Sequence, residues 1–128
     1  MEGELVMINN GTYAIYQGKE YKCDIEDEKN ICIYSESLDE GFNDFMGIYY
    51  KNISFMDCTR VFKRTLCFKY NHDSFLIREE KDDKVLLETG PRAYDLISLG
   101  FKRILNDTFQ KWVPLSEGEK YWAIYEYK

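Results

Sequence analysis

The sequence predicts a mainly β protein built from two tandem, similar antiparallel β-units packed together, with short helical segments. A single α+β domain is the alternative. Two observations favour this fold class: short segments in which apolar and polar residues alternate are separated by turns, and the chain matches itself when it is shifted by 54 to 60 positions. With 45% hydrophobic and 16% aromatic residues, the chain has enough apolar surface to fold into an ordered globular protein.

The internal match keeps its order along the chain. A shift of 54 aligns Tyr16 with Tyr70, Tyr21 with Phe75, Cys23 with Ile77, Ile31 with Val85, Cys32 with Leu86, and Ile33 with Leu87. Shifts of 59 and 60 then align Gly41-Phe42 with Gly100-Phe101, residues 51–57 with 111–117, and Phe62 with Trp122. This collinear series indicates a duplication into residues 1–64 and 65–128; two unrelated runs of β-hairpins are the alternative.

Each predicted unit has the order strand, tight turn, strand, charged turn, strand, irregular or short helical segment, and strand. In the first unit the strands are expected at residues 12–16, 20–25, 31–35 and 48–55. In the second unit they are expected at residues 66–70, 74–79, 84–89 and 110–115. Gly18 suits the first tight turn because glycine accepts positive φ, while Asn71 and Asp73 suit the second turn through local side-chain bonding.

Two segments have mixed signals. In residues 93–107, the apolar side chains Ile97, Phe101, Ile104 and Leu105 recur every three to four residues, which predicts a helix. Gly100 in its middle costs about 1 kcal/mol relative to alanine and disfavours one continuous helix.

Residues 117–128 are open between helix and strand, because Ser116 and Glu119 are spaced like a capping box whereas the following tyrosines alternate as in a strand.

The predicted units resemble a known class of small β folds. A unit of about 60 residues buries proportionally little surface, so we expect the two copies to pack together. Small, strongly bent antiparallel sheets with aromatic cores are similar to SH3-like barrels. This topological resemblance implies a tandem of two SH3-like units.

Cysteine usage and the N-terminal stretch favour a cytoplasmic location. Cys23, Cys32, Cys58 and Cys67 stand singly, without the close pairs of zinc or redox motifs, and are expected to be free, buried small hydrophobes. In a hairpin of residues 21–25 and 31–35, Cys23 would point inward and Cys32 outward. The start, MEGELVMINN, lacks the pattern of a secretory signal, and no apolar run approaches the ~20 residues of a membrane helix.

Catalytic and nucleic-acid-binding signatures are missing from the sequence. The single histidine, His72, lies in a predicted turn without a positioned acid–base partner, and no phosphate loop, zinc or calcium motif is present, so neither an enzyme nor a cofactor is expected. The net charge of −6 argues against nucleic acid as a partner. The short basic clusters Arg60-Lys63-Arg64 and Lys102-Arg103 are expected to be solvated edges.

The acidic excess is concentrated in one segment. Between Glu20 and Asp44 there are nine acidic residues and only two lysines. This charge indicates either a solvated face or a docking surface for a basic protein, because a concentrated negative field steers basic partners. The candidate partner-binding residues are Glu26, Asp27, Glu28, Glu36, Asp39, Glu40, Asp44, Tyr49 and Tyr50.

Size, charge and the layout Y-x-G-K-x-Y … I-x-I … G-F … K-x-I resemble bacterial immunity proteins that neutralise the toxins of polymorphic or contact-dependent systems. The resemblance implies capture of a cognate toxin, often a basic nuclease, with the acidic residues displacing substrate phosphates. A peptide-binding adaptor with aromatic SH3-like grooves is the competing hypothesis. A small hydrolase that uses His72 is the third.

Overall fold

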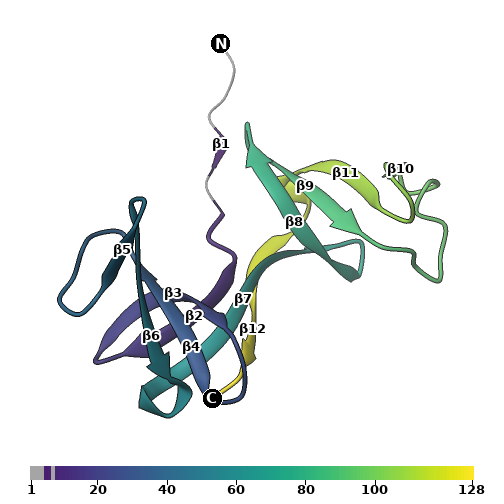
Figure 1. The fold of residues 1–128 in the computed structure, drawn as a ribbon. Helices are drawn as coiled ribbons and strands as arrows, with labels where there is room; N and C mark the ends of the chain where they lie inside the picture. Colours follow the sequence, from purple (N-terminus) through teal and green to yellow (C-terminus); the bar gives the residue numbers. More distant parts are fainter. Residues whose placement is uncertain (1–4, 7) are drawn as a thin grey trace. The chain divides into compact units, whose positions relative to one another are not determined.

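The computed structural model describes residues 5, 6 and 8–128. Residues 1–4 and 7 belong to the N-terminal stretch in which no secretory signal was predicted, and they lie outside the described residues. The structure confirms the mainly β, antiparallel fold class (Figure 1). Its helical parts are two single turns of 3-10 helix among the described residues.

The chain divides into two compact units. The first unit comprises residues 10–64 and 124–128, and the second comprises residues 65–123 together with the described residues up to Asn9. Each unit therefore takes a short segment from the opposite end of the chain. The division into repeats at residues 64 and 65 stays a prediction.

The first unit is an antiparallel sheet in the order β7-β2-β3-β4-β6-β5. Its strands are β2 (Gly11–Tyr16), β3 (Lys19–Ile25), β4 (Asn30–Ser35), β5 (Asn43–Phe45), β6 (Ile48–Ser54) and the beginning of β7 (Cys58–Tyr70). The 3-10 turn η1 (Phe55–Asp57) links β6 to β7, and the Ser54 hydroxyl accepts a hydrogen bond from the Met56 amide at its start.

The second unit repeats this order of elements. It contains the rest of β7, β8 (Asp73–Lys81), β9 (Lys84–Thr89), β10 (Lys102–Arg103), β11 (Phe109–Pro114), the 3-10 turn η2 (Leu115–Glu117) and most of β12 (Glu119–Glu126). The strand order is β7-β8-β9-β11-β10, and the short strand β1 (Leu5–Val6) pairs with β8. The order is open in both units and ends at β5 and β10.

Residues that align in the sequence occupy corresponding positions in the two sheets. Ala14 is opposite Tyr21 in the first unit, and Phe68 is opposite Phe75 in the second, as a shift of 54 requires. Further along, the pair Ile31–Ile53 corresponds to Val85–Val113, and the pair Asp44–Tyr49 corresponds to Arg103–Phe109. The two units therefore share the register of these pairs. The register differs after Ile77, where a shift in β8 puts Glu80 opposite Val85, whereas Ile25 is opposite Ile31 in the first unit.

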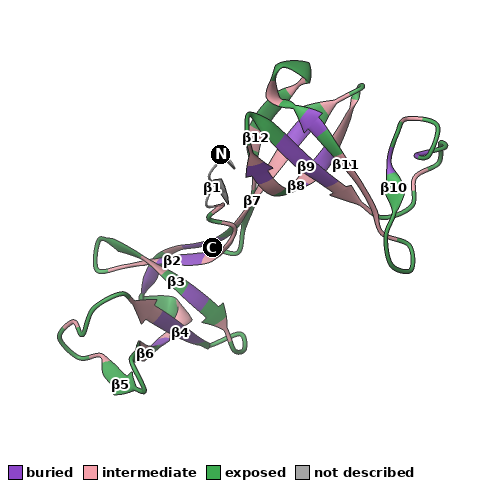
Figure 2. Ribbon diagram, turned by 90° about the horizontal axis from the view of Figure 1, so that it is seen from above, coloured by how far each residue is buried: buried purple, intermediate pink, exposed green. Residues whose placement is uncertain are grey.

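Each unit has its own apolar core, and Figure 2 shows buried segments in purple in the strands of both units. The core of the first unit contains Ala14, Cys23, Ile31, Ile33, Ile53, Cys58 and Val61. The core of the second contains Phe68, Phe75, Ile77, Val85, Leu87, Leu96, Phe101 and Val113. Full burial of one large apolar side chain contributes about 1.5–3 kcal/mol, so these residues are the main source of stability in each unit.

The four cysteines are free thiols. Cys23 lies in the core of the first unit, as the hairpin pattern predicts. Cys32 is opposite Asp24 and lies outside that core, but it is only 6% exposed. Cys32 therefore lies outside the core, as expected, but it is still shielded from solvent.

The tight turns use residues in the left-handed region. Gln17 and Gly18 connect β2 to β3 with φ of 52° and 78°, and Asn71 and His72 connect β7 to β8 with φ of 51° and 65°. Two-residue turns of this kind match the twist of the flanking strands. Asp73, expected in the second turn, is the first residue of β8 instead.

The predicted helix over residues 93–107 is wrong. A single turn covers Leu96–Gly100, where the amides of Gly100 and Phe101 donate to the carbonyls of Ile97 and Leu96. Gly100 has φ of +93°, which is the left-handed conformation that ends a helical turn. The apolar spacing reflects Leu96 and Phe101 entering the core, while Ile97, Ile104 and Leu105 remain exposed.

The C-terminal segment, left open between helix and strand, forms the strand β12 after the single turn η2. β12 pairs with β7. No helix in the described part of the chain has the length and apolar character needed to cross a membrane.

Gly118, just before β12, is packed too closely to accept a side chain. A Cβ atom at this position would overlap the carbonyl oxygen of Lys69 and lie 2.6 Å from the buried ring of Phe68. We expect Gly118→Ala to lower the free energy of unfolding by about 1–3 kcal/mol or more, measured by urea denaturation, because backbone and core must move. Gly90→Ala is the control, since its Cβ would meet only one carbonyl at 3.9 Å; equal losses in the two variants would contradict the packing argument.

Candidate functional site

The structure separates the predicted acidic site into two groups. Glu26, Asp27 and Glu28 lie in the turn between β3 and β4, whereas Glu36, Asp39, Glu40 and Asp44 lie in the loop after β4 and in β5. The six residues of β4 separate these groups by about 20 Å, because a strand rises about 3.3 Å per residue. Neighbouring positions in the sequence are thus divided between opposite ends of one strand.

In the turn between β3 and β4, Asp27 has a structural role. Its carboxylate accepts hydrogen bonds from the backbone amides of Lys29 and Asn30 at 2.7 and 2.9 Å and from the Asn30 side chain. The Asn30 side chain, followed by the Lys29 amide, lowers the pKa of Asp27. This carboxylate closes the turn, which leaves Glu26 and Glu28 as the exposed acidic side chains at this end.

In the second group, Asp39 anchors the loop that follows β4. It accepts hydrogen bonds from the hydroxyl groups of Ser35 and Ser37 at 2.8 and 3.1 Å and from the Lys19 ammonium at 3.1 Å. These bonds, led by that of Ser35, lower the pKa of Asp39. The loop is therefore held to the start of β3, and its carboxylates Glu36 and Glu40 remain exposed.

A second anchor lies beneath the same loop. The Lys51 ammonium donates to the Tyr16 hydroxyl at 3.3 Å and lies over the Tyr16 ring. Gly41 passes so close that a Cβ there would be 3.1 Å from the Lys51 Nζ atom. With φ of +82°, Gly41 turns the chain into Phe42, whose ring packs 5.4 Å from the ring of Tyr21.

The β5–β6 hairpin exposes apolar side chains beside this acidic loop. Asp44 accepts a hydrogen bond from the Gly47 amide at 3.0 Å and closes the turn. Phe45, Met46 and Ile48 are 62%, 89% and 54% exposed. We use the name acidic tip for Glu36, Glu40, Asp44, Phe45, Met46 and Ile48.

The two predicted tyrosines lie behind the acidic tip on β6. Tyr49 is opposite Ser35 and Tyr50 is opposite Tyr34, so their side chains point to opposite faces of the sheet. Both are half-buried. Met46 and Ile48 were not among the candidate residues; the two-residue turn Met46-Gly47 between paired strand residues was the signal that could have identified them.

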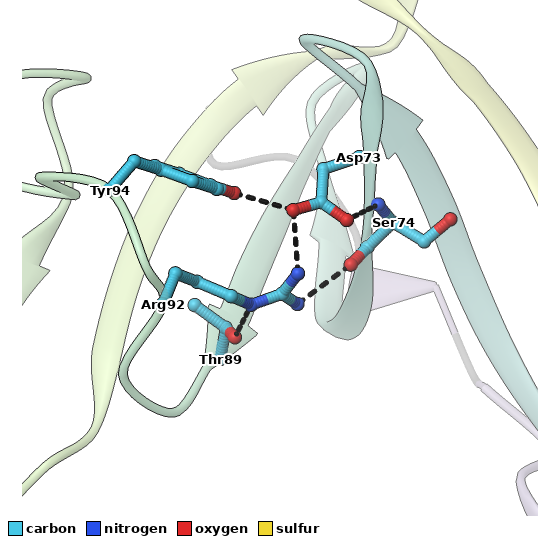
Figure 3. Close-up of polar contacts among 5 residues, drawn as sticks. All are labelled: Asp73, Ser74, Thr89, Arg92 and Tyr94. Carbon is cyan, nitrogen blue, oxygen red and sulfur yellow. Dashed lines mark hydrogen bonds and ion pairs between the residues drawn. The ribbon is translucent and has the colours of Figure 1, made fainter.

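The second unit contains the counterpart of the Lys19–Asp39 ion pair with its charges exchanged. Figure 3 shows Arg92 donating to the Asp73 carboxylate at 2.7 Å, the Ser74 carbonyl at 2.8 Å and the Thr89 hydroxyl at 2.8 Å. The Tyr94 hydroxyl also donates to Asp73 at 2.7 Å. At the shift of 54, Asp73 corresponds to Lys19 and Thr89 to Ser35.

The cation of each ion pair lies over an equivalent aromatic ring. Lys19 is 5.3 Å from the centre of the Tyr21 ring, and Arg92 is 4.7 Å from the centre of the Phe75 ring. Tyr21 and Phe75 are aligned residues, although Lys19 comes from a strand and Arg92 from a loop. The position of the positive charge is thus kept while the residue that supplies it changes.

The groups that could perform chemistry are poorly placed for it in the described part of the chain. Burial raises the pKa of Cys23 to about 12, and burial also raises the pKa of Cys32, Cys58 and Cys67, which disfavours a nucleophilic thiolate. His72 is an exposed turn residue. No group of three or more histidine, cysteine or acidic side chains that could hold a metal ion is found among the described residues.

Comparison with known proteins identifies a family. Residues 8–126 match the family described as "Uncharacterised conserved protein UCP033725", which covers most of the chain, so the protein belongs to this family. No curated protein and no solved structure matches the chain.

The Asp73 network makes stability depend on pH. The Tyr94 hydroxyl, the Ser74 amide and Arg92 lower the pKa of Asp73, so the folded protein favours the charged carboxylate more than the unfolded chain does. This contribution is present above the unfolded pKa of about 4 and disappears as the pH falls through the lower pKa of the folded state. We expect Asp73→Asn to reduce the free energy of unfolding by about 1 kcal/mol at pH 7, with the difference vanishing under strongly acidic conditions.

Urea denaturation at pH 7, 5 and 3 measures this difference. Asp82→Asn is the matched control, because Asp82 is an exposed turn residue with φ of 54° that asparagine also tolerates. A loss of stability in Asp73→Asn that persists unchanged at low pH would contradict the assignment.

Proposed function

We propose that the protein is a non-catalytic binding protein whose acidic tip docks onto a basic protein. A single observation carries the proposal: exposed carboxylates and exposed apolar side chains lie together on an anchored loop and hairpin of the first unit. Monomeric proteins rarely expose clustered apolar side chains without a use, and such clusters rimmed by polar residues are typical of protein-binding sites.

The chemistry of the acidic tip suits recognition of a basic surface. Glu36, Glu40 and Asp44 provide negative charge that speeds encounter with a positive partner and disfavours acidic proteins. Phe45, Met46 and Ile48 provide the apolar contact that slows dissociation once the complex has formed. The loop is pre-organised by Asp39, so binding costs little additional ordering.

The turn that contains Glu26, Asp27 and Glu28 has a weaker claim to this role. It lies at the other end of β4, and Asp27 is occupied by closing the turn. We therefore place the main contact at the acidic tip and retain Glu26 and Glu28 as a peripheral negative charge.

We further propose that the partner is a cognate toxin and that the protein is of the immunity type, as its size, charge and sequence layout suggest. A basic nuclease would present a positive substrate groove, in which Glu36, Glu40 and Asp44 would take the place of nucleic-acid phosphates. The four free cysteines support a cytoplasmic location, where thiols stay reduced.

The architecture that we propose is a duplication of one SH3-like unit at residues 64 and 65. It is supported by the common order of elements, the matching cross-strand pairs and the recurrence of the loop anchors. In the second unit, Lys111 donates to the Tyr70 hydroxyl at 2.6 Å beside Gly100, as Lys51 does to Tyr16 beside Gly41. Phe101 and Phe75 pack at 5.2 Å, like Phe42 and Tyr21.

The test uses the purified product of the gene adjacent to this one as the probe. We expect the double variant Glu36→Gln/Glu40→Gln to lower the association rate constant by about fivefold to tenfold at low salt, measured by biolayer interferometry, because the steering charge is removed. Inhibition of the probe's nuclease activity should weaken in parallel.

The double variant Glu26→Gln/Glu28→Gln removes the same charge at the other end of β4 and is the matched control. Its smaller effect would locate the contact at the acidic tip. Equal effects of both variants would contradict that location, and binding that is insensitive to salt would favour a peptide-groove adaptor instead.

A further inference from the structure

The second unit exposes an apolar tip at the position that corresponds to the acidic tip. Phe45 is the last residue of β5 and Met46 follows it; at the shift of 59 they correspond to Ile104 and Leu105, which follow β10. Ile104 and Leu105 are 50% and 73% exposed. We use the name basic tip for Lys102, Arg103, Ile104 and Leu105.

The two tips carry opposite charges at corresponding positions. Asp44 precedes the apolar pair in the first unit and Arg103 precedes it in the second, where both are opposite an aromatic residue of the next strand. Lys102 adds a second positive charge to the basic tip, while Glu36 and Glu40 add negative charge to the acidic tip. The side chain of Arg103 is 62% exposed, although it also contacts Asp107 at 3.4 Å.

Both tips lie at the edges of the sheets. β5 and β10 are the last strands of the strand order, and all of their residues are exposed, as the green colour of both segments shows in Figure 2. Neither apolar pair belongs to the core of its unit. An acidic apolar tip and a basic apolar tip on one chain complement each other in both charge and apolar character.

We propose that two copies of this protein associate through these surfaces, with the acidic tip of one copy docked onto the basic tip of the other. Asp44 would face Lys102 and Arg103 across the contact, and Met46 would bury against Leu105. Contact between two acidic tips is disfavoured by like charge. Because each copy carries both halves, the arrangement closes into a symmetric pair if the geometry allows, and otherwise extends into a chain.

This self-association goes beyond the proposed function but uses the same acidic tip. Binding of a basic partner and binding of a second copy therefore exclude each other. The two ideas fail independently, because self-association is measured on the protein alone.

Sedimentation velocity of the full chain over a range of concentration and salt tests the proposal. We expect mass to rise with concentration and to fall as salt is added, since part of the attraction is electrostatic. Met46→Asp at the acidic tip and Leu105→Asp at the basic tip should each reduce the association constant by about tenfold or more, because each replaces an apolar contact by a carboxylate that loses its hydration on burial.

The decisive measurement mixes the two variants. Met46→Asp keeps an intact basic tip and Leu105→Asp keeps an intact acidic tip, so an equimolar mixture should form pairs that neither variant forms alone at the same total concentration. Met56→Asp is the control, since Met56 is 78% exposed in η1 and belongs to neither tip; it should associate like the unaltered protein. Urea denaturation verifies that all three variants remain folded.

Three outcomes would overturn the proposal. Mass that is independent of concentration in the unaltered protein excludes self-association. An effect of Met46→Asp without an effect of Leu105→Asp excludes the basic tip. Variants that stay monomeric when mixed show that the two tips do not contact each other.

Discussion

The ion pair that fastens the long loop of each unit to a neighbouring hairpin is the interaction on which the rest of the site depends. Lys19 holds Asp39 in the first unit, and Arg92 holds Asp73 in the second. Both pairs are partly exposed, so their Coulomb energy in water is modest. Their importance is geometric. They fix loop segments that have no cross-strand hydrogen bonds of their own, and the exposed hairpins follow directly after these loops.

The two units carry opposite charges at corresponding positions of this ion pair, although their order of strands is the same. Residues 1–64 contain seven basic and twelve acidic side chains, whereas residues 65–128 contain ten and eleven. The same exchange recurs at Asp44 and Arg103, at the base of the two exposed hairpins. One order of strands thus presents a strongly negative surface in one unit and a nearly balanced one in the other.

The fold class and much of the register could be predicted from the sequence, because cross-strand partners must both be apolar where a sheet covers a core. The corresponding pairs Ile31–Ile53 and Val85–Val113 illustrate this, since both partners of each pair are buried apolar residues. The error over residues 93–107 had a physical cause: Leu96 and Phe101 are buried by one turn that ends at Gly100, and a run of such spacing resembles a helix.

The candidate site could be predicted only in part, because charge was counted along the chain and not in space. Because β4 is six residues long, Glu28 and Glu36 lie near its opposite ends, and the amino-acid composition alone does not reveal this separation. Met46 and Ile48 were not among the candidate residues, since apolar side chains are most often buried. Met46 lies in the two-residue turn between β5 and β6, and Ile48 is the first residue of β6 beside that turn, so both side chains are exposed.

The exchange of chain ends between the units governs how the protein can be divided. Tyr127 and Lys128 donate backbone hydrogen bonds to Val61 at 2.8 and 3.1 Å, and Leu5 and Val6 pair with β8. A cut between residues 64 and 65 would remove paired strand residues from both halves and leave unpaired backbone groups, which favours aggregation. The two units depend on these end segments, and a circularly permuted chain that keeps them in place is a safer starting point for engineering than either half alone.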